Sequence, residues 1–415
     1  MDRLSNLASQ LAPNDASAVS KLLEKHPDDV VIVGAYRSAL TKGGKGGFKD
    51  TTAADILTAV LKGLIERTGV DPKYLGDVCV GNVLAPGSGV TEHRAACLAA
   101  GIPYSVPYIS INRQCSSGLM SVDHIFKGIK TGDIDAGIGG GVESMSINFG
   151  PGSVSEFSDF LANHEEGKKC LIPMGVTSEN VAEAYGVTRK MQDEFAADSY
   201  RKAEAAQKAG KFKEEIIPIK TKFIDPKTEQ VSEIVVSEDD GIRPGVTPES
   251  LSKIRPAFKK DGTTHAGNAS QISDGAAAVL LARRSFAQKQ GWPIVGKFVD
   301  CAVVGVPPEV MGVGPAVAIP AVLERNGLTK DDVDIYEINE AFASQCLYSV
   351  LDCKIDPAKV NPNGGAIAFG HPLGCTGSRQ IATLIQEFKQ YNKKIGLTSM
   401  CIGTGMGAAA IITAE

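Results

Sequence analysis

The chain has 415 residues, 43% hydrophobic and 22% charged, as expected for a globular protein with more than one core. Its net charge is −5 and it has no block of basic residues, so a nucleic-acid partner is not expected. No apolar run approaches the roughly 20 residues of a membrane span. The nine cysteines are spread singly without a Cys-x-x-Cys pair. This argues against a disulfide scaffold or structural zinc and favours reduced thiols in an intracellular compartment.

Residues 1–27 are predicted to form a separate N-terminal segment, because the first strand-like run begins only after them. Within it, Arg3-Leu4, five residues and then Gln10-Leu11 resemble the N-terminal type 2 peroxisomal targeting signal. On a helix this spacing places the leucines on one face, which suits a receptor groove. An ordinary amphipathic N-terminus would show the same pattern. The signal predicts the peroxisomal matrix as the location and the import receptor as a partner.

Hydrophobic periodicity over residues 28–145 predicts alternating strands and helices. Short apolar or β-branched runs predict buried strands over residues 30–33, 77–83, 106–111 and 136–142. Apolar residues at helical spacing predict helices over residues 53–67, 93–100 and 121–129. The strand over 136–142 is rich in glycine and ends in Glu143.

Cys115 is predicted at the junction between the strand over 106–111 and the following helix. Free N–H groups and the positive end of the helix dipole would favour a thiolate at this position. The neighbouring Ser116-Ser117-Gly118 would leave room for a substrate to approach the sulfur. A buried structural cysteine is the alternative, and this stretch by itself supports both interpretations equally.

Residues 146–265 contain few long apolar runs and many charges, with a charged amphipathic helix predicted over 187–209. Strand character returns only at 276–282, so this region is predicted to be an insertion. Lys and Arg slightly outnumber the acidic residues between Arg189 and Lys222. We interpret this stretch as a solvated helical face. A docking surface for a phosphorylated ligand is the alternative.

From Gly296 onward the order of parts repeats that of the first half. A strand is predicted over 332–339, a cysteine precedes a helix over 379–388, and a glycine-rich strand covers 398–408. The chain is therefore predicted to be a duplicated α/β unit. The predicted domains are residues 1–27, residues 28–145 together with 266–295, the inserted residues 146–265, and residues 296–415.

Three residues with complementary chemistry lie at predicted element junctions, where α/β folds place their sites. Cys115 precedes a helix, His371 lies in a Gly-His-Pro turn, and Cys401 ends a strand. A nucleophilic cysteine needs a base such as histidine, and a second thiol could move a proton at another atom. Glycines beside Cys401 would let backbone N–H groups face an oxyanion. Asn339 could hold a water or donate to a carbonyl.

The four motifs that carry these residues resemble those of the thiolase family in order and spacing. They are Cys115-Ser116-Ser117-Gly118, Asn339-Glu340-Ala341-Phe342, Gly370-His371-Pro372-Leu373-Gly374 and Cys401-Ile402-Gly403-Thr404-Gly405. The resemblance extends over residues 29–414 and is greatest to the fungal type of peroxisomal 3-ketoacyl-CoA thiolase. It implies a duplicated five-layered α/β/α/β/α core with a loop domain inserted in the first half.

The resemblance also implies a role for each site residue. Cys115 matches the nucleophile that becomes acylated, His371 its base, and Cys401 the thiol that protonates the departing acetyl-CoA carbanion and later deprotonates CoA. His371 and a water held by Asn339 would stabilise the enolate. The N–H groups of Cys115 and Gly403 would hold the tetrahedral oxyanion.

The substrates implied by the resemblance are 3-ketoacyl-CoA and CoA, in peroxisomal fatty-acid β-oxidation. The products would be acetyl-CoA and an acyl-CoA two carbons shorter. Met174, Phe258 and Ser270 match family positions along the pantetheine path. No metal or redox cofactor is expected, since CoA is itself a substrate, and a homodimer is expected.

One departure separates two branches of the family. Pro173 precedes Met174-Gly175, where biosynthetic acetoacetyl-CoA thiolases typically have a histidine. This favours the degradative branch over an acetoacetyl-CoA thiolase that serves condensation. A non-catalytic acyl-CoA or lipid carrier and a redox sensor based on the thiols are the remaining alternatives.

Overall fold

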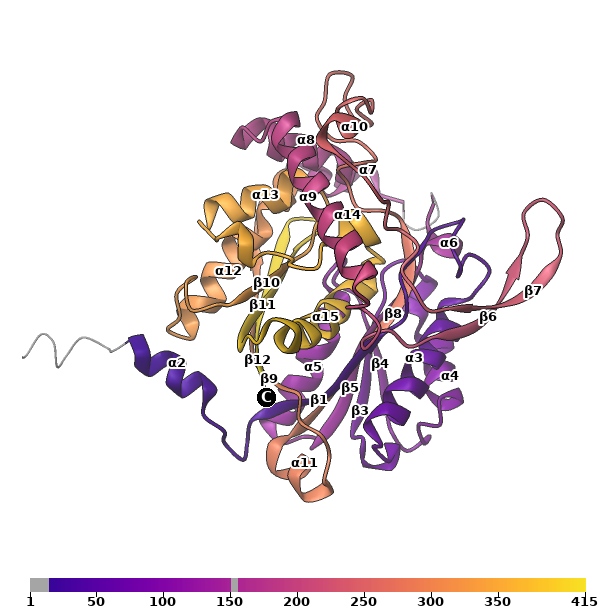
Figure 1. Ribbon diagram of the computed structural model, residues 1–415, viewed down its shortest axis with the longest axis vertical. Coiled ribbons are helices and arrows are strands. Elements are labelled where there is room, and N and C mark those ends of the chain that lie inside the picture. The colour runs from indigo at the N-terminus through magenta and orange to yellow at the C-terminus, as the bar shows by residue number, and fades with distance from the viewer. Residues whose placement is uncertain (1–14, 151–155) are drawn as a thin grey trace, which may run out of the picture.

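The computed structural model describes residues 15–150 and 156–415. It consists of two similar halves that share one large sheet, with a mainly helical segment inserted in the first half (Figure 1). The residues of the predicted targeting signal, Arg3, Leu4, Gln10 and Leu11, lie outside the described residues. In the described ranges, no helix has the length and apolar character needed to cross a membrane.

The first half contains a sheet in the order β1-β8-β5-β3-β4. β3 runs parallel to β4 and β5, and β8 runs antiparallel to β1 and β5. The strands are β1 (Val30–Arg37), β3 (Asp77–Gly81), β4 (Tyr108–Ile111), β5 (Ala136–Ser144) and β8 (Ser273–Arg283), and the short β2 (Thr41–Lys42) also pairs with β8. β4, which was predicted to be buried, is an edge strand with partly exposed side chains because no strand follows it in the sheet.

The second half repeats this arrangement in the order β9-β12-β11-β10. Its strands are β9 (Gly296–Gly305), β10 (Ile335–Ile338), β11 (Ile395–Ile402) and β12 (Met406–Ala414). β10 pairs with β11 in parallel, with Ile338 opposite Ser399, as β3 pairs with β5, with Gly81 opposite Gly141. The glycine-rich stretch predicted as one strand forms the end of β11, a turn and the start of β12. β1 and β9 join the two half-sheets.

Helices form the remaining layers. α3 (Ala53–Thr68) and α4 (Val90–Ala99) cover the outer face of the first half, and α12 (Gly314–Arg325) and α13 (Ala343–Asp352) lie on the outer side of the second. α5 (Ser117–Thr131) and α15 (Thr376–Tyr391) contact one another between the half-sheets. Leu119, Val122 and Ile125 of α5 share a buried core with Ile381, Leu384 and Ile385 of α15. The five-layered duplicated fold is therefore confirmed.

The inserted segment lies between β5 and β8. Its elements are α6 (Met145–Asn148), α7 (Asp159–Asn163), α8 (Met174–Tyr185), α9 (Arg189–Lys208), the hairpin β6 (Ile219–Ile224) and β7 (Val231–Val236), and α10 (Pro248–Ser252). α8 and α9 pack on α13, and α9 also packs on α14 (Ala366–Phe369). The charged helix α9 is only half solvated, because Ala196, Tyr200 and Ala203 are buried. The domain boundaries given above stay a prediction.

Two further helices flank the strands that begin the two halves. α2 (Asp15–Leu23) packs Leu22 into the outer core of the second half, and α11 (Arg284–Gln290) follows β8.

α3 illustrates the local signals that set helix ends. The Thr52 hydroxyl accepts the N–H of Asp55 at its start, and Gly69, with φ of 67°, ends it in the left-handed conformation.

Candidate active site

Cys115, His371 and Cys401 lie on three separate segments that the fold brings together. Cys115 follows β4 and precedes α5, His371 lies between α14 and α15, and Cys401 lies near the end of β11. The backbone N–H of Gly403 donates to the Cys115 sulfur, and the two thiols interact electrostatically. Asn339 Nδ2 lies 3.3 Å from His371 Nε2. The site therefore combines one segment of the first half with three of the second.

The turn that carries Cys115 is closed by its own side chains. Gln114 adopts a positive φ of 49°, and its N–H donates to Asn112 Oδ1 at 3.0 Å. The Ser116 hydroxyl donates to the Arg113 carbonyl at 2.9 Å, and the Ser117 hydroxyl donates to the Gln114 carbonyl at 2.6 Å. Both serines are fully buried. The serines therefore fix the backbone of the turn, and the room that Ser116, Ser117 and Gly118 would leave for the substrate stays a prediction.

The Cys115 thiol is protonated in the free protein near neutral pH. Burial raises the pKa of Cys115 to about 11, and N–H donation from Gly403 and from Cys115 itself offsets only part of this shift. The N–H groups at this junction favour the thiolate, as the sequence predicts, but desolvation outweighs them. Cys115 needs a base to become a nucleophile.

His371 is the base that the sequence predicts, and hydrogen-bond partners hold both of its ring nitrogens. Asn339 Nδ2 can only donate, so His371 Nε2 accepts, and Nδ1 carries the proton of the neutral ring. Nδ1 then donates to Thr376 Oγ1 at 2.6 Å, and that hydroxyl donates to the Pro372 carbonyl at 3.4 Å. Burial, and secondly the positive charge of Arg379, lower the pKa of His371 to about 3. The imidazole is thus neutral, with its basic lone pair on Nε2.

Cys401 and Asn339 complete the buried part of the site. Cys401 packs with Met311 and Ala341, and burial raises the pKa of its thiol well above the usual range. Asn339 follows β10, and its N–H donates to the Ser399 carbonyl on β11 at 2.8 Å. Its buried Oδ1 has no hydrogen-bond partner in the part of the chain that the structure describes. Asn339 can therefore accept a hydrogen bond from a water or ligand.

The three residues predicted along the pantetheine path surround these groups at different distances. Met174 Sδ lies 3.6 Å from the position that a Cβ on Gly403 would take, so it borders the site directly. Phe258 packs its ring against Gly175, the next residue after Met174. Ser270 is further along the same segment, and its N–H donates to the Ala341 carbonyl at 2.9 Å.

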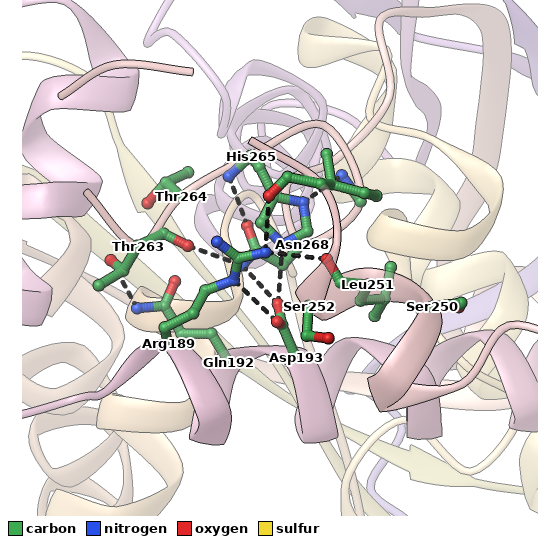
Figure 2. Close-up of polar contacts among 12 residues, drawn as sticks. Arg189, Gln192, Asp193, Ser250, Leu251, Ser252, Thr263, Thr264, His265 and Asn268 are labelled. Atoms are coloured by element: carbon green, nitrogen blue, oxygen red, sulfur yellow. Dashed lines mark hydrogen bonds and ion pairs between the residues drawn. The ribbon is translucent and has the colours of Figure 1, made fainter. Parts of the chain in front are cut away.

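A buried polar cluster holds the segment that carries Phe258 and Ser270 (Figure 2). Asp193 of α9 accepts from His265 at 2.8 Å, from Asn268 at 3.1 Å and from Arg189 at 2.7 Å. Arg189 also donates to two backbone carbonyls of the segment. The cluster fixes this part of the insertion to α9, and residues 268–270 then pair with the backbone that follows Asn339.

Sequence reasoning missed two residues that organise the site. Thr376 lies five residues after His371, beyond the Gly-His-Pro motif, and its hydroxyl is hydrogen-bonded to Nδ1 of His371. Glu143 ends the glycine-rich strand and accepts four hydrogen bonds from the loops around the site. A carboxylate at the end of an otherwise apolar, glycine-rich strand was the available signal for Glu143. Nothing in the sequence pattern indicated Thr376.

Comparison with known proteins gives a consistent result over nearly the whole chain. The model of the thiolase N-terminal domain matches residues 30–285, and that of the thiolase C-terminal domain matches residues 292–414. The chain is 63% identical over 415 residues to "3-ketoacyl-CoA thiolase, peroxisomal" of Yarrowia lipolytica, with both proteins covered completely. It is 54% identical to the protein of the same name from Saccharomyces cerevisiae, covering 98% of this chain and 97% of that one.

Solved structures agree. The crystal structure of the dimeric peroxisomal thiolase of Saccharomyces cerevisiae has a TM-score of 0.90 and 55% identity, covering 95% of this chain and all of that one. A second structure of the peroxisomal 3-ketoacyl-CoA thiolase of that yeast, described as five-layered with two core domains of identical topology, has a TM-score of 0.78 and 49% identity, with the same coverage. The chain therefore belongs to the thiolase family.

Proposed function

We propose that the protein is an acetyl-CoA C-acyltransferase that cleaves 3-ketoacyl-CoA with CoA in peroxisomal fatty-acid β-oxidation. The observation that carries this proposal is that the half-buried Cys115 thiol lies by the Gly403 N–H and the buried Cys401 thiol. Asn339, whose N–H donates to the Ser399 carbonyl on the strand of Cys401, contacts the neutral imidazole of His371. The names of the two yeast relatives, both peroxisomal 3-ketoacyl-CoA thiolases, support the same reaction and location.

In the first half-reaction, His371 Nε2 takes the proton of Cys115, and the thiolate attacks the 3-keto carbon of the substrate. The bond between C2 and C3 then breaks, and its electron pair remains on C2 as the enolate of acetyl-CoA. Cys401 donates its proton to C2, which releases acetyl-CoA. The remaining acyl chain is then a thioester on Cys115, and Cys401 is a thiolate.

In the second half-reaction, the Cys401 thiolate takes the proton of CoA, and the CoA sulfur attacks the acyl thioester. The intermediate collapses by expelling Cys115 as a thiolate, which recovers its proton from His371. The product is an acyl-CoA two carbons shorter. The reaction needs no metal or redox cofactor, because every proton and electron pair stays among the thiols, the imidazole and the two substrates.

Negative charge develops at two oxygen positions during this sequence. The tetrahedral oxyanion forms on the carbon bound to Cys115, where the N–H groups of Cys115 and Gly403 already point toward the sulfur. The enolate oxygen would face His371 and a water held by Asn339. Met174, Phe258 and Ser270 would contact the pantetheine arm of the substrate.

A product analysis tests the reaction. With a medium-chain 3-ketoacyl-CoA and CoA, we expect equal amounts of acetyl-CoA and the acyl-CoA two carbons shorter, with an acylated Cys115 peptide when CoA is omitted. Faster turnover of acetoacetyl-CoA than of the medium-chain substrate would instead favour the short-chain alternative. Binding of the substrate without CoA-dependent product would identify a carrier and contradict the proposal.

We further propose that the protein forms a homodimer and enters the peroxisome through its N-terminal type 2 signal. The dimeric state named for the Saccharomyces cerevisiae structure supports the first proposal. For the second, we expect residues 1–20 to direct a fluorescent protein to peroxisomes and the Leu4→Arg variant to leave it in the cytosol. A diffuse signal with the unmodified segment would show that Arg3-Leu4 and Gln10-Leu11 are not the address.

A further inference from the structure

Glu143 ends β5 as a buried carboxylate whose two oxygens are both fully used. Oε1 accepts from Asn82 Nδ2 and from the N–H of Leu84, each at 3.1 Å. Oε2 accepts from the N–H of Val83 and from the N–H of Gly374, each at 3.0 Å. A carboxylate offers about four acceptor positions, so this side chain satisfies four donors from two separate loops.

One of these loops leads to the nucleophile. The Val83 carbonyl accepts from Asn112 Nδ2 at 3.1 Å, and Asn112 Oδ1 accepts the N–H of Gln114 at 3.0 Å. Gln114 has a positive φ and immediately precedes Cys115. Three successive hydrogen bonds therefore connect the carboxylate of Glu143 to the turn that carries Cys115.

The other loop carries the base. Gly374 belongs to the short stretch between His371 and α15, and its carbonyl packs directly on the first half. A Cβ on Gly141 would lie 2.0 Å from this oxygen, and one on Gly118 would lie 2.6 Å from it. A side chain at Gly118 or Gly141 would therefore push the backbone of the first half away from Gly374. Glu143 holds the two backbones together at this junction.

We propose that Glu143 is a positioning residue that sets the distance between the nucleophile of the first half and the base of the second. This inference rests on the proposed function of Cys115 and His371. Glu143 acts through the two loops and does not touch the reacting atoms. Small displacements of reacting groups are costly to the rate of reaction. Loss of one contact at this junction should therefore reduce kcat more than it reduces the free energy of unfolding.

The substitution Glu143→Gln tests this role with almost no change in volume. In either orientation, the amide NH2 faces two N–H donors that the carboxylate satisfied, which displaces the loop of residues 82–84, and in one orientation Gly374 as well. We expect kcat to fall about 100-fold, while KM for CoA changes less than about threefold. We also expect slower alkylation of Cys115 by iodoacetamide, because the thiol is no longer aligned with His371.

The alkylation readout needs no substrate, so it separates this proposal from the proposed reaction. Absence of thiolysis in the wild type would overturn the reaction, whereas wild-type alkylation and kcat in Glu143→Gln would overturn the positioning role. Ile138→Val removes one methylene from the same strand and serves as the control. An equal loss of kcat in this variant at an equal fall in melting temperature would show that Glu143 is only structural.

A milder variant keeps the proposal testable if Glu143→Gln does not fold. Asn112→Ala removes the exposed side chain that links the Val83 carbonyl to Gln114 and leaves the buried carboxylate intact. We expect kcat and the alkylation rate to fall together, by a smaller factor than in Glu143→Gln. Wild-type values for both would contradict a route from Glu143 to Cys115.

Discussion

The substitution Cys115→Ala is expected to lower the rate of thiolysis by at least ~10⁴-fold, the order of loss seen when an enzyme nucleophile is removed. Only the sulfur is lost, and the N–H groups of Cys115 and Gly403 that define the oxyanion position remain. The variant should therefore still bind 3-ketoacyl-CoA but form neither acetyl-CoA nor an acyl-enzyme. Intact-protein mass after incubation with substrate would show the difference directly.

Cys79→Ala is a matched control for this result. Cys79 is a fully buried thiol on β3 and packs in the central core, away from the loops that carry the site. Its removal should cost stability, about 1 kcal/mol for a small cavity, with little change in kcat. Comparable turnover in Cys115→Ala and the wild type would mean that Cys115 is structural and that the acyl-enzyme mechanism is wrong.

The second large effect is expected for His371→Gln, which keeps a polar side chain but removes the base. With a pKa of about 3, the imidazole is neutral throughout the physiological range, so Nε2 carries no proton of its own when the thiol is to be deprotonated. Without it, the Cys115 thiol must ionise unaided. We expect kcat to fall ~10³-fold or more, within the range for a lost general base.

The pH dependence of Cys115 alkylation provides a second test of His371 as the base. With a pKa of about 11, the thiolate fraction of Cys115 in the wild type rises tenfold for each pH unit below that value, so its alkylation should increase steeply from pH 7 to 10. His371→Gln should be alkylated more slowly at each pH, because the imidazole no longer accepts the thiol proton. His124→Gln, at an exposed position on α5, should behave like the wild type. Wild-type alkylation rates in His371→Gln throughout this range would exclude His371 as the base.

The sequence indicated the α/β repeat and the three candidate residues Cys115, His371 and Cys401 because each leaves a local signature. Cys115 precedes a helix with clear apolar periodicity, and His371 and Cys401 lie among glycines and proline at element ends. The two half-sheets with matching strand orders confirm the duplication inferred from these repeated parts. Hydrophobic periodicity and turn residues are short-range features, so they can be detected before any tertiary contact is known.

Features that depend on long-range contacts could not be predicted in the same way. The pKa of Cys115 depends on burial, which raises it, and on the N–H of Gly403, which lowers it from a segment far away in the sequence. The burial of Ser116 and Ser117, and the hydrogen bonds by which they close the turn, likewise depend on tertiary packing. Glu143 contacts Gly374 across 231 positions, and a spacing of that length carries no periodic signal.

Because the two halves share one fold, each strand position of the repeat occurs twice. At one of these positions the two halves carry residues of different chemistry. In both halves an asparagine follows the strand that pairs in parallel with the glycine-rich strand, Asn82 after β3 and Asn339 after β10. The glycine-rich strand carries Glu143 in the first half and Cys401 in the second, at equivalent register. One position of the repeated unit therefore holds a carboxylate that accepts four hydrogen bonds in the first half and a buried thiol in the second.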